Sequence, residues 1–135
     1  MLKLIIGVKG TGKTKTLINL VNSALEVTKG DVVCIEKGVK LRYDIKPTAR
    51  LVDVEEYMIA DAQSLYGFIA GILASNHDVT DLFVDSTLKI CKGDIPSFEE
   101  LVVELDRLSN KLGVNMLMTV SMPEDQVSET IKKYI

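Results

Sequence analysis

The sequence has no tryptophan, and only 5% of its 135 residues are aromatic. Stacking of bases on aromatic side chains, the device of many single-strand-binding proteins, is therefore not expected to be its main mode of recognition. Two cysteines, Cys34 and Cys91, are too few for a disulfide scaffold or a four-cysteine zinc site. Both lie in apolar runs, so we expect buried free thiols. A single histidine, His77, excludes a histidine-rich metal site.

Long hydrophobic runs are also missing. The longest uncharged apolar stretch, residues 65–74, is far shorter than the roughly 20 residues that a membrane-spanning helix needs. The apolar residues 2–6 lead directly into glycines and lysines, without the cleavage site of a signal peptide. We therefore expect a cytoplasmic protein with no membrane partner, folded as one domain over residues 1–135.

The net charge of -3 argues against a protein that binds phosphate backbones by bulk charge. The charge is uneven, because residues 1–50 hold ten Lys/Arg and four Asp/Glu, whereas residues 51–135 hold six and fifteen. The net negative charge disfavours a nucleic-acid partner, and the positive first part of the chain leaves such a partner open. A basic run in the first part fits either a solvated rim or a contact with nucleic acid or an acidic partner. Its residues are Lys37, Lys40, Arg42, Lys46 and Arg50.

Strand-like and helix-like segments alternate along the chain. Continuous apolar runs predict buried strands, and apolar residues at every third or fourth position predict helices. This alternation is typical of an α/β fold of three layers, with helices on both faces of a mostly parallel sheet. The predicted strands are residues 2–7, 31–36, 81–85 and 114–120, and the first two predicted helices are residues 14–28 and 61–76.

Local signals predict three further features. Ser97 and Glu100 match a capping box at the start of an amphipathic helix. Ser121 matches the N-cap of a last helix that runs to about Tyr134. Residues 39–43 and 50–54 flank a Lys-Pro-Thr turn at 46–48, which predicts a hairpin.

The strongest motif is GVKGTGKT at residues 7–14, which fits the pattern GxxxxGK[ST] completely. Gly10 and Gly12 allow the backbone to curl so that successive N–H groups point at an anion. The following helix adds its positive N-terminal end. Lys13 then reaches the β- and γ-phosphates, and the Thr14 hydroxyl is a ligand for Mg²⁺. The predicted phosphate contacts are Gly7, Val8, Lys9, Gly10, Thr11, Gly12, Lys13, Thr14 and Lys15.

These residues resemble the phosphate loop of the P-loop NTPases. The site of such proteins needs an acid at the end of another buried strand, and Asp85 follows the apolar residues 82–84. Because Ser86 comes next, this segment is similar to the aspartate-serine motif of the RecA and KaiC-type ATPases. The resemblance implies a RecA-like core in which Thr14 and Asp85 hold Mg²⁺. A looser likeness, confined to the phosphate loop, is to short bacterial proteins labelled PilT-type ATPases.

The same resemblance implies two more site residues. In the RecA-like group the catalytic glutamate ends the strand after the phosphate-loop helix, a position that matches Glu36 here. The carboxyl ends of parallel strands share one crevice, so a carboxylate there can orient the water that attacks the γ-phosphate; a solvated turn acid is the other interpretation. A polar sensor of the γ-phosphate is implied at the end of the strand 114–120, where Thr119 or Ser121 matches.

Three functions remain open on the sequence. The first is a weak ATPase that binds ATP and Mg²⁺, with Lys13 and Glu36 as catalytic residues, and acts as a nucleotide-dependent switch or assembly component. The second is a kinase of nucleosides or other small molecules, since the opening residues 4–7 resemble those of thymidine kinases. The third is a module that senses nucleotide without hydrolysing it.

The segment 61–76 raises the question of a partner chain. Residues 65–74 are apolar on nearly every side and include Gly67 and Gly71. Close packing of this helix on the sheet is one interpretation, and a homo-oligomer that covers its outer face is the other. Three arginines are candidates for a cation that reaches into a neighbouring subunit's site, although each also fits a solvated surface charge. They are Arg42, Arg50 and Arg107.

Overall fold

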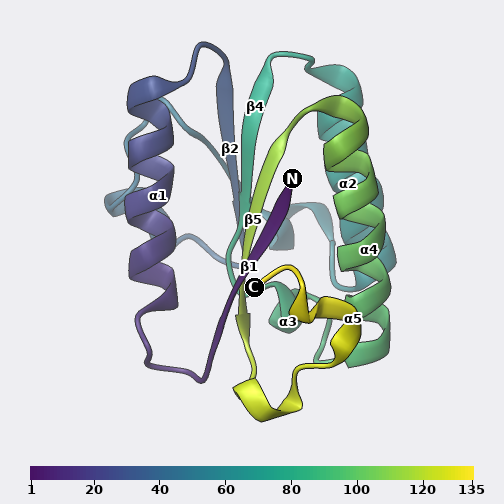
Figure 1. Cartoon of the computed structure of the whole chain (residues 1–135). Coiled ribbons are helices and arrows are strands. Elements are labelled where there is room, and N and C mark those ends of the chain that lie inside the picture. The colour runs from purple at the N-terminus through teal and green to yellow at the C-terminus, as the bar shows by residue number, and fades with distance from the viewer.

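The computed structural model describes residues 1–135, and it confirms the predicted three-layer α/β fold. Its centre is a five-stranded sheet in the order β1-β5-β4-β2-β3, in which every neighbouring pair is parallel (Figure 1). Strand β5 therefore separates β1 from β4, an order that could not be predicted from the sequence. The strands are β1 (Leu2–Gly7), β2 (Asp31–Glu36), β3 (Arg50–Asp53), β4 (Val79–Val84) and β5 (Asn115–Ser121).

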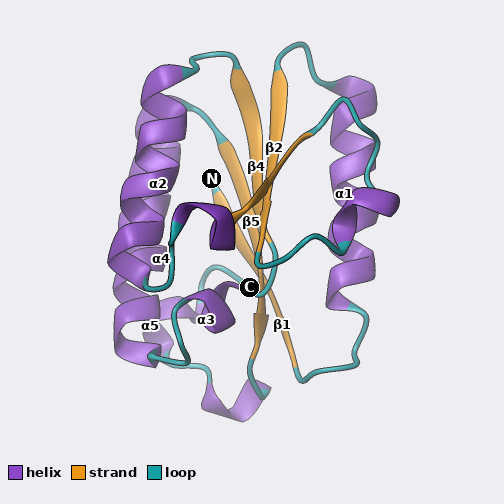
Figure 2. Cartoon of the chain, turned by 180° about the vertical axis from the view of Figure 1, so that it is seen from behind, coloured by secondary structure: helices purple, strands orange, loops and turns teal.

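Helices cover the two faces of the sheet unequally. Helix α1 lies on one face, with the 3-10 helix η1 beside it, and the other α-helices lie on the opposite face (Figures 1 and 2). The cores follow this division, because the cluster under α2 and α4 contains 25 buried residues and the cluster under α1 contains 8. The helices are α1 (Lys13–Val27), α2 (Ala62–Ser75), α3 (Thr87–Ile90), α4 (Ile95–Leu112) and α5 (Glu129–Lys132), and the 3-10 helices are η1 (Leu41–Tyr43), η2 (Val54–Tyr57) and η3 (Glu124–Gln126).

The two long helices on the larger core begin with a side-chain cap. Asp61 accepts a hydrogen bond from the Ser64 N–H, and Asp94 accepts one from the Ser97 N–H. The predicted capping box of Ser97 and Glu100 is therefore displaced by one turn, because an aspartate earlier in the chain caps α4. At its other end α4 stops at Gly113, whose φ of 69° places it in the left-handed region.

The predicted hairpin is wrong. Residues 41–43 form the 3-10 helix η1, and β3 pairs in parallel with β2 on the edge of the sheet. An alternation of apolar and polar residues predicts a strand but not whether it runs parallel or antiparallel to its neighbour. Here the chain between β2 and β3 crosses over the face of the sheet that α1 covers. Leu41, Ile45 and Ala49 of this crossover pack into the smaller core.

The predicted start of the last helix is also wrong. Ser121 is the final residue of β5, where it pairs with Gly7 of β1, so it caps no helix. The chain then forms η3 and only one turn of α5. A short helix that was not predicted, α3, follows β4 directly.

Helix α2 packs on the sheet, as one of the two interpretations expected, but its glycines face outward. Gly67 and Gly71 are exposed, and a Cβ atom added to either would meet nothing within 4 Å. Leu65, Ile69 and Leu73 make the buried stripe instead. None of the helices has the length and hydropathy needed to cross a membrane.

Candidate functional site

The loop between β1 and α1 presents free backbone donors. Gly10 and Gly12 have φ angles of 89° and 83°, a left-handed conformation that favours glycine. None of the backbone N–H groups of residues 9–15 donates to an acceptor within the protein. Helix α1 also begins without a side-chain cap, in contrast to α2 and α4. A run of unused donors at the positive end of a 15-residue helix is the arrangement that attracts phosphate.

Side chains of the same loop stabilise its shape. The Thr11 hydroxyl and the Lys13 ammonium group both donate to the Val8 carbonyl, at 2.8 and 2.9 Å. The Lys13 ammonium group therefore lies over the loop. A Cβ atom on Gly7 would come within 2.6 Å of the Thr11 hydroxyl oxygen, so a larger residue there would displace that hydroxyl from the Val8 carbonyl.

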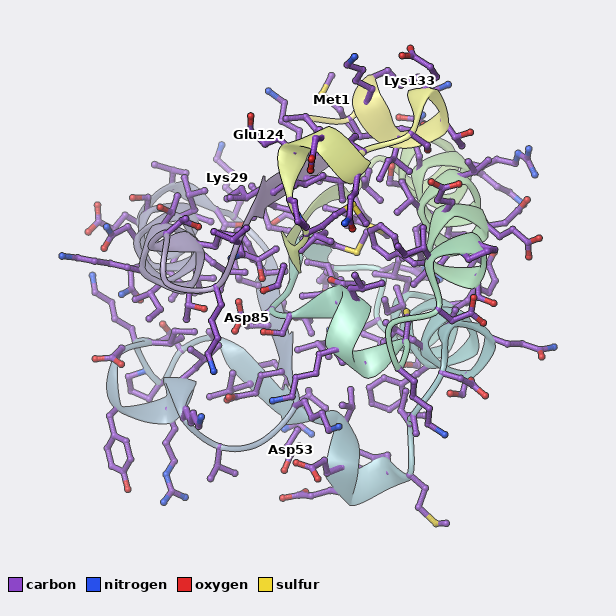
Figure 3. All side chains as sticks on the ribbon, turned by 90° about the horizontal axis from the view of Figure 1, so that it is seen from below. Met1, Lys29, Asp53, Asp85, Glu124 and Lys133 are labelled. Carbon is purple, nitrogen blue, oxygen red and sulfur yellow. The ribbon has the colours of Figure 1, made fainter.

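A second group of polar side chains meets at the carboxyl ends of β4 and β5. Asp85 is buried and accepts hydrogen bonds from the Thr119 hydroxyl at 2.6 Å and from the Thr14 hydroxyl at 3.2 and 3.3 Å. The Thr119 hydroxyl in turn accepts the Ser86 N–H at 2.7 Å. Two of the predicted residues, Thr14 and Thr119, thus share the carboxylate of a third, although the three are far apart in the sequence. Figure 3 looks onto this end of the sheet and shows Asp85 between α1 and α3.

This arrangement suits a hard cation. Carboxylate and hydroxyl oxygens are ligands that Mg²⁺ accepts, and it usually completes its shell with water and substrate phosphates. The protein has no group of three or more His, Cys, Asp or Glu side chains that could hold a metal ion, so Asp85 and Thr14 would supply only part of a metal's ligands. The Thr14 and Asp85 pair therefore fits a magnesium ion whose remaining ligands are waters or bound phosphates.

Glu36, at the end of β2, is buried, with only 4% of its surface exposed. Its carboxylate accepts the backbone N–H of Lys40 at 3.0 Å and that of Leu41 at 3.3 Å. Burial raises the pKa of Glu36 above its ordinary value, the two N–H donors oppose the rise, and the charges of Asp53 and Asp85 add to it. The interpretation as a solvated turn acid is wrong on this geometry.

One cavity of about 700 Å³ joins these groups. It also contains Ser121, the alternative to Thr119 as the polar sensor, and residues that the sequence analysis did not assign to the site, among them Lys37, Lys40, Ser86 and Lys89. Of the predicted residues, Gly7, Val8 and Thr11 do not line it and instead shape the loop behind it. The predicted residues that line it are Lys9, Gly10, Gly12, Lys13, Thr14, Lys15, Glu36, Asp85 and Thr119.

The candidate arginines lie outside this cavity. Arg107 is paired with Glu104 on the exposed side of α4, and Arg42 lies over the ring of Tyr43. Arg50 lines two other cavities near the edge strand β3. The chain therefore brings lysines, and no arginine, to its own candidate site.

Comparison with known proteins extends the fold assignment. The structure is similar to that of a KaiC-like protein from the hyperthermophilic archaeon Pyrococcus horikoshii OT3, with a TM-score of 0.68 and 18% sequence identity. The match covers 98% of this chain and 66% of that protein, so this chain spans slightly less than two thirds of its neighbour. The chain thus has a RecA/KaiC-like fold. No protein-family model matches the sequence, and no curated protein matches it.

Proposed function

We propose that this protein binds ATP with Mg²⁺ and hydrolyses it slowly, as a nucleotide-dependent switch or assembly component. The observation that carries the proposal is the set of unpaired N–H groups at residues 9–15, at the uncapped start of α1 and beside a lysine-lined cavity. Backbone donors of this kind bind phosphate oxygens without side-chain rearrangement. The similarity in fold to a KaiC-like protein supports the same assignment.

Each residue of the site then has a role. Lys13 neutralises the β- and γ-phosphates, and the loop amides orient them. Thr14 and Asp85 would hold Mg²⁺, which when bound offsets the negative charge of the phosphates. Thr119 fixes Asp85 through the 2.6 Å hydrogen bond and so positions the carboxylate.

Glu36 would orient the water that attacks the γ-phosphorus and accept its proton as the bond to the leaving ADP breaks. Its raised pKa suits a proton acceptor better than an ordinary carboxylate would. Both of its oxygens accept backbone N–H groups. A carboxylate has about four acceptor positions, so Glu36 can accept a hydrogen bond from water as well. The two N–H donors stabilise its charged form and so make it a weaker proton acceptor, which is a physical reason to expect slow turnover.

The test combines calorimetry with phosphate release. Wild type should bind ATP, and Lys13→Ala should abolish that binding while Lys111→Ala, an exposed lysine on α4, should leave it unchanged. Glu36→Gln should retain binding and lose phosphate release. ADP formation only after addition of a nucleoside would favour a kinase, and tight binding without turnover would favour a sensing module; either result rejects the ATPase.

Self-association through residues 61–76 stays a separate hypothesis. The exposed Gly67 and Gly71 leave room for a second helix to approach closely. Light scattering at high concentration should give a mass above that of one chain. A monomer under those conditions would reject the hypothesis and leave nucleotide binding unaffected.

A further inference from the structure

The candidate site contains more positive charge than the phosphate loop supplies. Three lysines from that loop region line the cavity, and Lys37, Lys40 and Lys89 line it from other segments. Only two acids, Glu36 and Asp85, are among the lining residues. Lys37 and Lys40 belong to the short connection between β2 and η1, which the sequence analysis described only as part of a basic run.

Two carboxylates hold this connection in place. The Gly38 N–H donates to the Asp53 carboxylate at 2.8 Å, and the Lys40 N–H donates to the Glu36 carboxylate at 3.0 Å. Glu36 ends β2, and Asp53 ends the neighbouring strand β3. The two acids pair in register, so both lie at the carboxyl ends of hydrogen-bonded strands. Gly38 has a φ of 112°, which suits a glycine at the turn. We call residues 37–40 the lysine loop.

The strand order shows from which side the lysine loop reaches the cavity. The phosphate loop follows β1 at one edge of the sheet, Asp85 follows β4 near the middle, and the lysine loop follows β2 beyond it. In Figure 3, Asp53, which holds the lysine loop, lies on the side of Asp85 away from β1. The phosphate loop and the lysine loop thus lie on opposite sides of Asp85.

We infer that Lys37 and Lys40 bind the terminal phosphate of a nucleoside triphosphate within the same chain, and that Glu36 and Asp53 are the positioning residues of this loop. The inference rests on the proposed function. Both loops line the same cavity, so a triphosphate chain held by the phosphate loop can place its terminal phosphate between Lys13 and the lysine loop. These lysines then supply from this chain the cation that no arginine of the chain supplies. The site distinguishes triphosphate from diphosphate without a neighbouring subunit.

The test is the ratio of the dissociation constants for ADP and ATP, measured by calorimetry with Mg²⁺. A charged hydrogen bond made only to the third phosphate predicts that Lys37→Ala/Lys40→Ala weakens ATP by about ten-fold or more and ADP by less than about two-fold. Lys46→Ala is the matched control, because Lys46 belongs to the same basic run but pairs with Glu26 away from the cavity. It should leave both constants unchanged.

A second pair of variants tests the positioning role. Asp53→Ala removes the acceptor for Gly38 and should lower the ratio in the same direction as the lysine variants, whereas Asp53→Asn keeps an acceptor oxygen and should restore it. Asp61→Ala is the control, because it removes a carboxylate that likewise accepts a backbone N–H but lies at the start of α2, outside the cavity. It should leave the ratio unchanged. Far-ultraviolet circular dichroism checks that each variant is folded.

The outcomes separate this inference from the proposed function. Equal weakening of ATP and ADP in the lysine variants, or none, would overturn the inference while nucleotide binding stood. An unchanged ratio in folded Asp53→Ala would overturn the positioning role. Failure of wild type to bind either nucleotide would reject the proposed function itself.

Discussion

Two buried threonines near Asp85, Thr119 and Thr87, should respond in opposite directions to the same substitution. The Thr119 hydroxyl donates to Asp85 and accepts from the Ser86 N–H, at 2.6 and 2.7 Å. The Thr87 hydroxyl, two residues after Asp85, is equally buried and has no hydrogen-bond partner. Valine has nearly the shape of threonine without its hydroxyl, so Thr→Val isolates the hydrogen bonds at each position.

The expected magnitudes differ by several kcal/mol. Thr119→Val removes a hydrogen bond to a carboxylate, which contributes about 1.5–3 kcal/mol, and leaves the Ser86 N–H without its acceptor, at a cost of about 1 kcal/mol or more. We expect the free energy of unfolding to fall by about 3 kcal/mol. Thr87→Val removes an unpaired buried hydroxyl, so the free energy of unfolding should rise by about 1 kcal/mol.

Urea denaturation of both variants gives the comparison directly. Thr119→Ser is the control, because it keeps the hydroxyl and loses one methyl group, for a cost of about 1 kcal/mol. For a chain of this size, the loss in Thr119→Val corresponds to a fall in melting temperature of about 10 °C. Equal stability of the two valine variants would refute the hydrogen-bond network described at Asp85.

Three other measurements test separate parts of the structure. Because the folded-state pKa of Glu36 is raised, its protonated form stabilises the fold, and this contribution is lost as the pH rises from the ordinary pKa through the raised one. The free energy of unfolding of Glu36→Gln relative to that of wild type should therefore increase over this pH window. A difference that does not change with pH would contradict the raised pKa. Burial raises the pKa of the Cys34 thiol, and it raises the pKa of the Cys91 thiol to about 12. Both thiols should therefore react with iodoacetamide far more slowly in native protein at about pH 8 than in urea. Equal rates would mean that the thiols are accessible in the folded protein. Gly30→Ala would bring a Cβ atom within 2.1 Å of the Asp78 carbonyl oxygen, so it should lower the free energy of unfolding by about 2 kcal/mol or more. Gly67→Ala, at an exposed position with open space around it, is the control and should not lower it in this way. An unchanged free energy of unfolding in Gly30→Ala would show that this turn can move.

Features that lie within one continuous segment were predictable from the sequence. The residues from Gly7 to Thr14 follow one another directly, so the order of residue types alone was enough to locate their loop. The strands and long helices were also predictable, because apolar periodicity reports directly which face of each element is buried.

Features that depend on contacts between distant segments could not be predicted. The direction of β3 is set by its pairing with β2, and the place of β5 is set by its pairing with both β1 and β4. The lysine loop was missed as part of the site because its place depends on Glu36 and Asp53, which only the sheet brings together.

The central claim is that the phosphate loop and Lys13 bind the phosphates of a nucleotide whose magnesium ion is held by Thr14 and Asp85. Isothermal titration of wild type and Lys13→Ala with ATP, with and without Mg²⁺, tests it most directly. We predict binding by wild type that is tighter with Mg²⁺, and none by folded Lys13→Ala. Equal ATP affinity of the two proteins, or the absence of binding to wild type, would contradict the claim.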